Sequence, residues 1–237
     1  DLSGKWSFSI DRQDNGEKEK WFSHTLNDFI NLPGSMPEKL KGDEVTAKTQ
    51  WTGSLYDSSY YYNPYMEKYR KEGNIKFPFF LTPDKHYVGA AWYQKEVNIP
   101  ADWKGERILL FLERPHIETT VWVNGQKTGM QNSLCVPHQY DITRYVRPGK
   151  CTITIRVDNR IKEINVGPDS HSITDQTQGN WNGIVGRICL QTTPKTYFDD
   201  IQIYPEPEQK LARVKVVIKG TGTAKVKLSA ESFNTDK

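Results

Sequence analysis

The chain has 237 residues, enough for one large β domain with or without a small neighbour, and 26% of them are charged. Its net charge of +3 is spread along the sequence without a sustained basic block, which argues against a nucleic-acid partner. No apolar run approaches the roughly 18 residues of a transmembrane helix, so we expect no membrane span.

Short segments with β-branched or aromatic residues at every second position recur along the chain and predict strands. Gly, Pro, Asn and Asp separate these segments, and no long helical pattern of apolar residues interrupts them. Many short strands with such turns indicate an all-β sandwich. The predicted strands are Lys5–Ile10, Trp92–Ile99, Arg107–Leu112, Thr119–Val123, Cys151–Val157 and Arg187–Gln191.

An irregular stretch lies between about residues 32 and 91, and aromatic side chains are crowded into residues 51–69. One interpretation of Ser54–Tyr65 is an aromatic groove for a ligand. The interpretation that we favour is that the rings pin a long insertion onto the sandwich, because long loops in compact domains need side-chain packing to stay ordered.

The sequence changes again after Pro194. Tyr197–Tyr204 resembles a strand that leaves the first domain, and Pro205 begins a polar joint. Leu211–Lys219 and Ala224–Ala230 read as two alternating strands joined by a Gly-Thr-Gly turn. Two strands do not make a stable sheet domain by themselves. We therefore expect a first domain over residues 1–204 and the opening strands of a second sandwich over residues 205–237.

The best candidate site is the polar segment 171–183, which ends in Trp-Asn-Gly. A sugar presents hydroxyl groups around its rim and C–H surfaces on its faces, so its site needs polar groups beside an aromatic ring. Asp175, Gln176, Asn180 and Trp181 supply these groups on one loop and are our predicted carbohydrate-binding residues. The alternative is structural: Trp181 closes the sandwich, and the polar side chains satisfy loop backbone groups.

Other chemistry finds little support in the sequence. Glu113 and Glu118 flank His116, where ion pairs or turn contacts are a better interpretation than the paired carboxylates of a glycosidase. The five histidines are scattered without metal-binding spacing. Cys135, Cys151 and Cys189 are too few for a disulfide framework. The sequence predicts no catalytic residue, metal site or cofactor in this chain.

Five ordered motifs carry a family resemblance. They are Trp92-Tyr93-Gln-Lys, Trp122-Val-Asn-Gly125, the stretch from Tyr140-Asp-Ile-Thr143 to Val146-Arg-Pro-Gly149, Val157-Asp-Asn159, and Trp181-Asn-Gly-Ile-Val-Gly-Arg187. In this order and spacing the chain resembles the N-terminal sugar-binding jelly roll of glycoside hydrolase family 2. The resemblance implies a jelly roll similar to galactose-binding domains, followed by the start of an immunoglobulin-like sandwich.

The resemblance also implies a function. The chain would be the non-catalytic front end of a retaining, exo-acting glycosidase, bracing a downstream catalytic barrel whose two glutamates lie beyond Lys237. A β-galactosidase is expected first, and a β-glucuronidase or β-mannosidase is the alternative. Asp175 is the nearest match to an aspartate that galactosidases of the family contribute to the sugar pocket. A periplasmic or extracellular location is implied by relatives that degrade glycans.

Two other classes of function stay open at this point. Jelly rolls also occur as free-standing carbohydrate-binding modules or lectins, and some sandwich domains serve only structure or assembly. The incomplete second sandwich favours the front end of an enzyme over a free-standing lectin.

Overall fold

The computed structural model describes residues 1–53, 57–134, 136–162, 167 and 169–231. The chain divides into two compact units, one made of residues 1–104 and 108–191 and the other of residues 105–107 and 192–237. No helix in the described ranges is long and apolar enough to cross a membrane.

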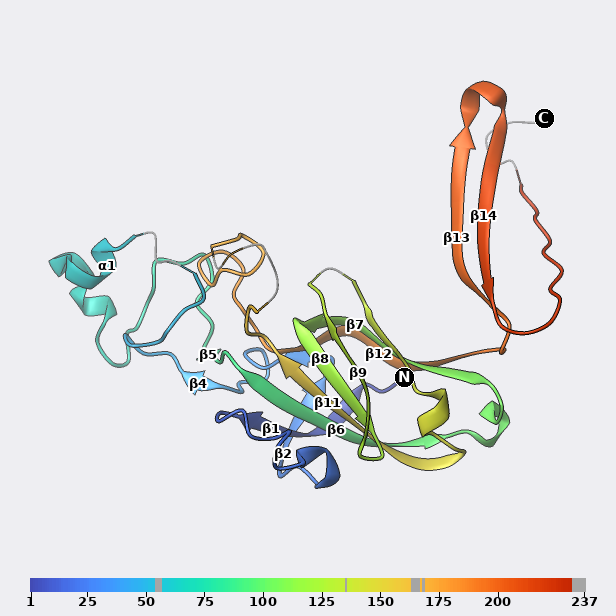
Figure 1. Ribbon diagram of the computed structural model, residues 1–237. Coiled ribbons are helices and arrows are strands. Elements are labelled where there is room, and N and C mark those ends of the chain that lie inside the picture. Colours follow the sequence, from blue (N-terminus) through green and yellow to red (C-terminus); the bar gives the residue numbers. More distant parts are fainter. Residues whose placement is uncertain (54–56, 135, 163–166, 168, 232–237) are drawn as a thin grey trace. The chain divides into compact units, whose positions relative to one another are not determined.

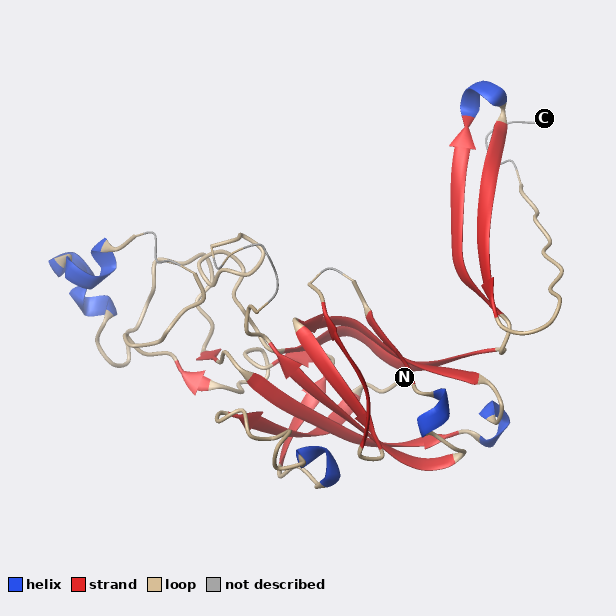
Figure 2. Cartoon of the chain, viewed as in Figure 1, coloured by secondary structure: helices blue, strands red, loops and turns tan. Residues whose placement is uncertain are grey.

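Two sheets form the first unit, as the strands in Figures 1 and 2 show. The larger sheet has the strand order β2-β1-β6-β11-β8-β9, and the smaller one has the order β10-β7-β12-β3. The larger sheet contains β1 (Gly4–Asp11), β2 (Asp28–Leu32), β6 (Ala90–Ile99), β8 (Glu118–Val123), β9 (Gln126–Asn132) and β11 (Gly149–Asp158). The smaller contains β3 (Gly34–Ser35), β7 (Arg107–His116), β10 (His138–Asp141) and β12 (Gly183–Thr193).

The remaining elements of the first unit are short. Strands β4 (Asp43–Glu44) and β5 (Lys85–His86) pair with each other. The one-turn helix α1 spans Ser59–Tyr62. The 3₁₀ turns are η1 (Trp21–Ser23), η2 (Pro64–Tyr69), η3 (Ala101–Trp103) and η4 (Thr143–Tyr145).

The main core lies between the two sheets and follows from the period-two pattern of their strands. In β11, Ile153, Ile155 and Val157 are fully buried in this core, which also takes Leu110 and Leu112 from β7. All six strands predicted for the sandwich are present. The prediction of an all-β sandwich is therefore confirmed.

A second, smaller cluster lies on the other face of the larger sheet. Trp92 and Trp122 alternate with core residues of β6 and β8 and so point away from the main core. Their indole rings lie 5.0 Å apart and pack with Leu26, Trp21 and Phe22. The segment that contains η1 thus covers two tryptophans that belong to the family motifs.

Asn124 and Gly125, which end the motif Trp122-Val-Asn-Gly125, form the turn that joins β8 to β9. Both residues have positive φ angles, of 49° and 76°, as a tight hairpin with the right-handed twist of its strands requires. The side chain of Asn124 also accepts a hydrogen bond from the Thr152 backbone at 2.9 Å. This turn is therefore tied to the neighbouring strand β11.

The aromatic insertion lies between β4 and β5. Tyr60 is buried and packs against Phe77, with ring centroids 4.7 Å apart. Trp51 contacts both Phe77 and Phe79 edge-on, at 4.9 and 5.0 Å. These contacts agree with the interpretation that rings order the insertion, although residues 54–56 of the proposed groove fall outside the described residues.

The second unit contains one antiparallel ribbon, β13 (Tyr197–Glu206) and β14 (Leu211–Lys219), joined by the 3₁₀ turn η5 (Pro207–Gln209). The predicted pairing of Leu211–Lys219 with Ala224–Ala230 is wrong, because β14 pairs with β13 and residues 224–230 form no strand. The division of the units falls after Gln191, whereas the sequence places a domain boundary after residue 204. Strand β13 groups with β14 because the two are paired along most of their length, with one register shift between Phe198 and Asp200.

Candidate functional site

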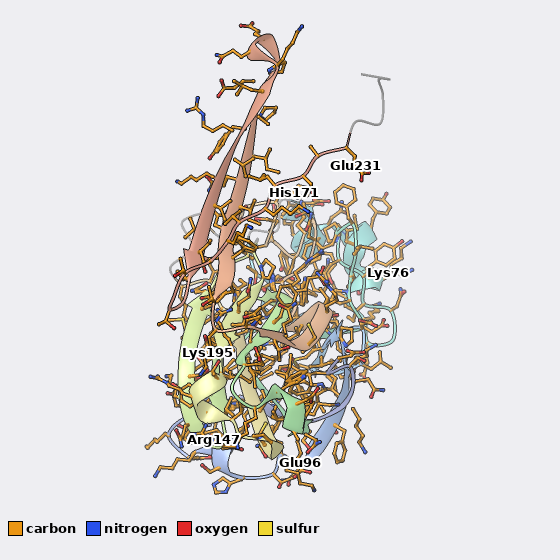
Figure 3. The ribbon with its side chains drawn as sticks, turned by 90° about the vertical axis from the view of Figure 1, so that its right-hand side faces the viewer. Lys76, Glu96, Arg147, His171, Lys195 and Glu231 are labelled. Atoms are coloured by element: carbon orange, nitrogen blue, oxygen red, sulfur yellow. The ribbon has the colours of Figure 1, made fainter. Side chains whose placement is uncertain are left out.

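The predicted carbohydrate loop connects the end of β11 to the start of β12. It lies at the end of the sandwich where β6 begins, since Ala90 is paired with Asp158. In Figure 3 the loop residue His171 marks this end, together with Lys76 of the insertion, and Glu96 and Arg147 mark the opposite end. The loop and the insertion therefore meet at one end of the first unit.

Asp175 is buried and fastens the loop to the insertion. Its Oδ2 accepts a hydrogen bond from the Thr52 backbone N–H at 2.7 Å, and its Oδ1 accepts one from the Asn180 N–H at 2.6 Å. His86 Nε2 lies 3.1 Å from Oδ2 and packs 4.6 Å from the ring of Trp51. The Asp175 backbone N–H in turn donates to the Thr52 carbonyl at 3.0 Å. Both carboxylate oxygens are thus occupied by protein groups.

Asn180 is the second buried member of this network. Its side-chain amide donates to Thr52 Oγ1 at 2.9 Å and to the Asn159 carbonyl at 3.0 Å. Its Oδ1 lies 3.2 Å from His116 Nε2. Thr52 therefore contacts both Asp175 and Asn180, and it is the point at which the insertion holds the loop.

His116 supports the loop from strand β7. Burial lowers the pKa of His116 to about 4, and the hydrogen bond to Asn180 offsets only part of this effect. The ring is therefore neutral near pH 7, and its Nε2–H donates to the Asn180 amide oxygen. Trp181 stacks on the same imidazole with ring centroids 4.6 Å apart and planes 20° apart. The indole of Trp181 stays half-buried.

Two buried amides close the sandwich beneath the loop. Asn159 accepts from the Gly89 N–H at 2.8 Å and donates to the Tyr87 carbonyl at 2.9 Å. Asn182 accepts from the Tyr93 hydroxyl at 2.8 Å and donates to the Gly89 carbonyl at 2.9 Å. These residues of the family motifs satisfy buried backbone groups where β6 begins, which makes the end of the sandwich rigid.

The carboxylates near His116 form ion pairs, as the sequence predicts. Glu113 accepts from the Arg187 backbone N–H at 2.7 Å and from its guanidinium at 3.1 Å. Glu118 pairs with Lys162 at 2.9 Å and with Arg156 at 3.4 Å. The interactions of Glu113 link β7 to β12, and those of Glu118 neutralise its charge at the first residue of β8.

A charged cluster lies beside Asn159. Asp158 is fully buried, which by itself would raise its pKa, but hydrogen bonds from Arg160 and Lys162 and the charge of Arg156 hold that pKa well below its usual value. Arg156 and Arg160 also pair with Asp14 at 2.6 Å. This ionised network fixes the chain where it leaves β11.

The structure therefore brings the four predicted residues onto one loop but gives them different surroundings. Asp175 and Asn180 are buried, whereas Gln176 and Trp181 are half-buried. Three further residues of the site, Thr52, His86 and His116, are not indicated as site residues by the sequence. Thr52 and Asp175 are 123 positions apart, and no local pattern indicates their pairing.

Within the described residues, no group of three or more His, Cys, Asp or Glu side chains is suited to a metal ion. Cys151 and Cys189 are free thiols, and Cys135 lies outside the described residues. The chemistry that the loop offers is that of hydrogen bonding and aromatic stacking.

Several β-glucuronidases are similar to the chain in sequence. The human enzyme is 28% identical over 168 residues, which cover 61% of this chain and 26% of that protein. The Paenibacillus borealis enzyme is 25% identical over 218 residues, which cover 86% of this chain and 30% of that protein. The chain thus spans about a quarter to a third of the length of these relatives.

Solved structures show the same fold. The β-glucuronidase of Ruminococcus gnavus in complex with uronic isofagomine has a TM-score of 0.63 at 18% identity, covering 93% of this chain and 33% of that one. These relatives do not support the expectation of a β-galactosidase, since each is a β-glucuronidase. Residues 1–194 match the family described as "Glycosyl hydrolases family 2, sugar binding domain". The chain therefore belongs to the sugar-binding domain of the glycosyl hydrolases of family 2.

Proposed function

We propose that this chain is the N-terminal part of a β-glucuronidase-type, retaining exo-glycosidase, in which it braces a catalytic barrel and contributes to carbohydrate binding. The observation that carries this proposal is that its sequence relatives and its structural neighbours are β-glucuronidases. The hydrolysis itself would be catalysed by the remaining part of such a β-glucuronidase, to which this chain does not align.

Within this function, the buried residues of the loop position the half-buried ones. Asp175 and Asn180 have protein partners on their polar atoms, so they hold the loop in one conformation. Gln176 and Trp181 retain accessible surface. A preorganised loop of this kind loses less conformational entropy when a sugar binds. We infer that Gln176 and Trp181 contact the carbohydrate and that Asp175 sets their position.

The test is the substrate preference of the full-length protein. We expect 4-nitrophenyl β-D-glucuronide to be hydrolysed with a kcat/KM at least about tenfold above that of the β-D-galactoside, a difference of about 1.4 kcal/mol in transition-state binding. A preference for the galactoside would contradict the proposal. NMR of the released sugar shows whether the configuration at the anomeric carbon is retained, which tests the retaining mechanism that we assign to the barrel.

A further inference from the structure

A cleft of about 330 Å³ lies on the larger sheet, far from the predicted carbohydrate loop. It is bordered by the η1 segment, by β6 and β11, and by the turn between β8 and β9. Thr152, at the cleft, and Asp158, near the loop, are six residues apart on β11, which corresponds to about 20 Å along the strand. The volume is at the lower end of the range of ligand pockets, about 300–1,000 Å³.

One wall of the cleft is a fixed aromatic ring. Phe22 stacks on Trp122 with ring centroids 5.2 Å apart and planes 6° apart. Trp122 packs in turn on the fully buried Trp92. Phe22 remains half-buried, so part of its ring is accessible although its orientation is set by the tryptophans beneath. A ring held in this way can stack on a ligand with little loss of entropy.

The other walls carry uncharged polar groups that the protein leaves unused. The hydroxyls of Ser23, Thr25 and Thr152 and the imidazole of His24 make no hydrogen bond with any described residue. Gln94 uses its amide nitrogen on the His24 carbonyl at 2.9 Å and on Thr154 at 3.1 Å, which leaves its carbonyl oxygen without a partner in the described part of the chain. The cleft is thus lined by hydrogen-bond donors and by hydrogen-bond acceptors.

This lining selects a class of ligand. Among the described residues, no carboxylate, lysine or arginine borders the cleft, so a charged ligand would find no ion pair with them. A purely apolar ligand would bury these polar groups. It would take away the hydrogen bonds that they make with water and offer none in return. A neutral sugar has both a C–H face for the ring and hydroxyls for the rim. We propose that this cleft is a second carbohydrate site, specific for uncharged sugars and separate from the loop of residues 171–182.

The test is an NMR titration of the 237-residue chain with cellobiose, with far-UV circular dichroism as the check that each variant is folded. We expect weak binding, with a Kd of about 1–10 mM. Phe22→Ala should abolish it, and the double variant Thr25→Val/Thr152→Val should weaken it about tenfold by removing two hydroxyls at nearly constant volume. Phe29→Ala is the matched control, because this exposed phenylalanine on β2 does not border the cleft.

Three outcomes would overturn the proposal. They are the absence of cellobiose binding by the wild-type chain, wild-type affinity in the folded double variant, and binding that survives in the double variant but is lost in Asp175→Asn. The last result would place the sugar at the loop instead. The double variant keeps the test decisive if Phe22→Ala does not fold, and none of these results depends on the substrate preference proposed above.

Discussion

His86 is the residue whose role the structure defines most sharply. It reaches Asp175 from β5, and both side chains are almost fully buried. The sequence shows His86 only as one of five scattered histidines, without a partner. Its contact with Asp175 supplements the backbone bond from Thr52, so the loop is held by a side chain as well as by the main chain of the insertion.

His86→Ala should loosen the loop without unfolding the sandwich. The substitution removes one partner of a buried carboxylate, which costs about 1–3 kcal/mol. We expect faster amide hydrogen exchange in residues 171–182 and unchanged exchange in β6 and β11. His24→Ala is the control, because its exposed ring makes no hydrogen bond in the described part of the chain. Unchanged protection of the loop would show that His86 does not hold it.

His116 gives the loop a dependence on pH. Its folded pKa of about 4 lies below the usual 6.5, so between these values the unfolded chain binds the proton more readily than the folded one. The contribution of the neutral His116 ring to the free energy of unfolding is thus fully present above pH 6.5. It is lost as the pH decreases toward 4, by roughly 3 kcal/mol in total.

His116→Gln should remove this contribution, because glutamine does not titrate. The measurement is urea unfolding of the wild type and the variant between pH 7 and pH 4, and the difference between their stabilities isolates His116 from the carboxylates. The wild type should lose stability more steeply as the pH falls. Parallel pH profiles would mean that His116 titrates normally.

At the scale of single elements, the start of β12 depends on one glycine. Gly183 has a φ of 146° and pairs with Ser35 of β3. A Cβ atom at this position would lie 2.5 Å from the Gly34 carbonyl oxygen and 2.8 Å from the Ser35 Cα, so the backbones would have to separate. This close approach lets β3 pair with β12 at the edge of the smaller sheet.

Gly183→Ala should therefore destabilise the chain by roughly 2–4 kcal/mol. The control is Gly129→Ala in β9, where an added Cβ would meet Tyr140 at an ordinary 3.7 Å. We expect the control to change the free energy of unfolding by less than about 1 kcal/mol. Equal effects of the two substitutions in a urea titration would contradict the close-approach argument.

The elements that the sequence predicted are those with a local signal. The Asn124-Gly125 turn and the strands beside it follow from turn chemistry and period-two alternation, which act within a few residues. The partner of β14 did not follow, because residues 224–230 alternate as a strand does while the actual partner, β13, precedes β14 in the chain. Alternation predicts that a strand forms, but it does not identify its neighbour.

The candidate site shows the same limit over a longer distance. The residue types of the loop pointed to carbohydrate, since carboxylate, amide and indole groups lie together in the sequence. Asp175 is held by Thr52 of the distant insertion, whereas the half-buried Trp181 stacks on His116 of β7. Contacts between residues that are far apart in the chain produce no periodic pattern in the sequence.

At the scale of the whole molecule, the two units differ in how fully they bury their apolar residues. The first has a continuous core between its sheets. In the second, Ile201, Ile203 and Tyr204 of β13 are at least half exposed. A two-stranded ribbon is marginal by itself. This difference agrees with a chain that spans about a third of the structures it resembles.

The most direct test of the account is a crystal structure of the full-length protein with glucuronic acid bound in the catalytic pocket. We predict that Gln176 or Trp181 contacts the sugar, with heavy atoms within about 4 Å. We also predict that Asp175 keeps its hydrogen bonds to Thr52 and Asn180. A bound sugar with no atom near residues 174–181 would contradict the role in carbohydrate binding that we assign to this loop.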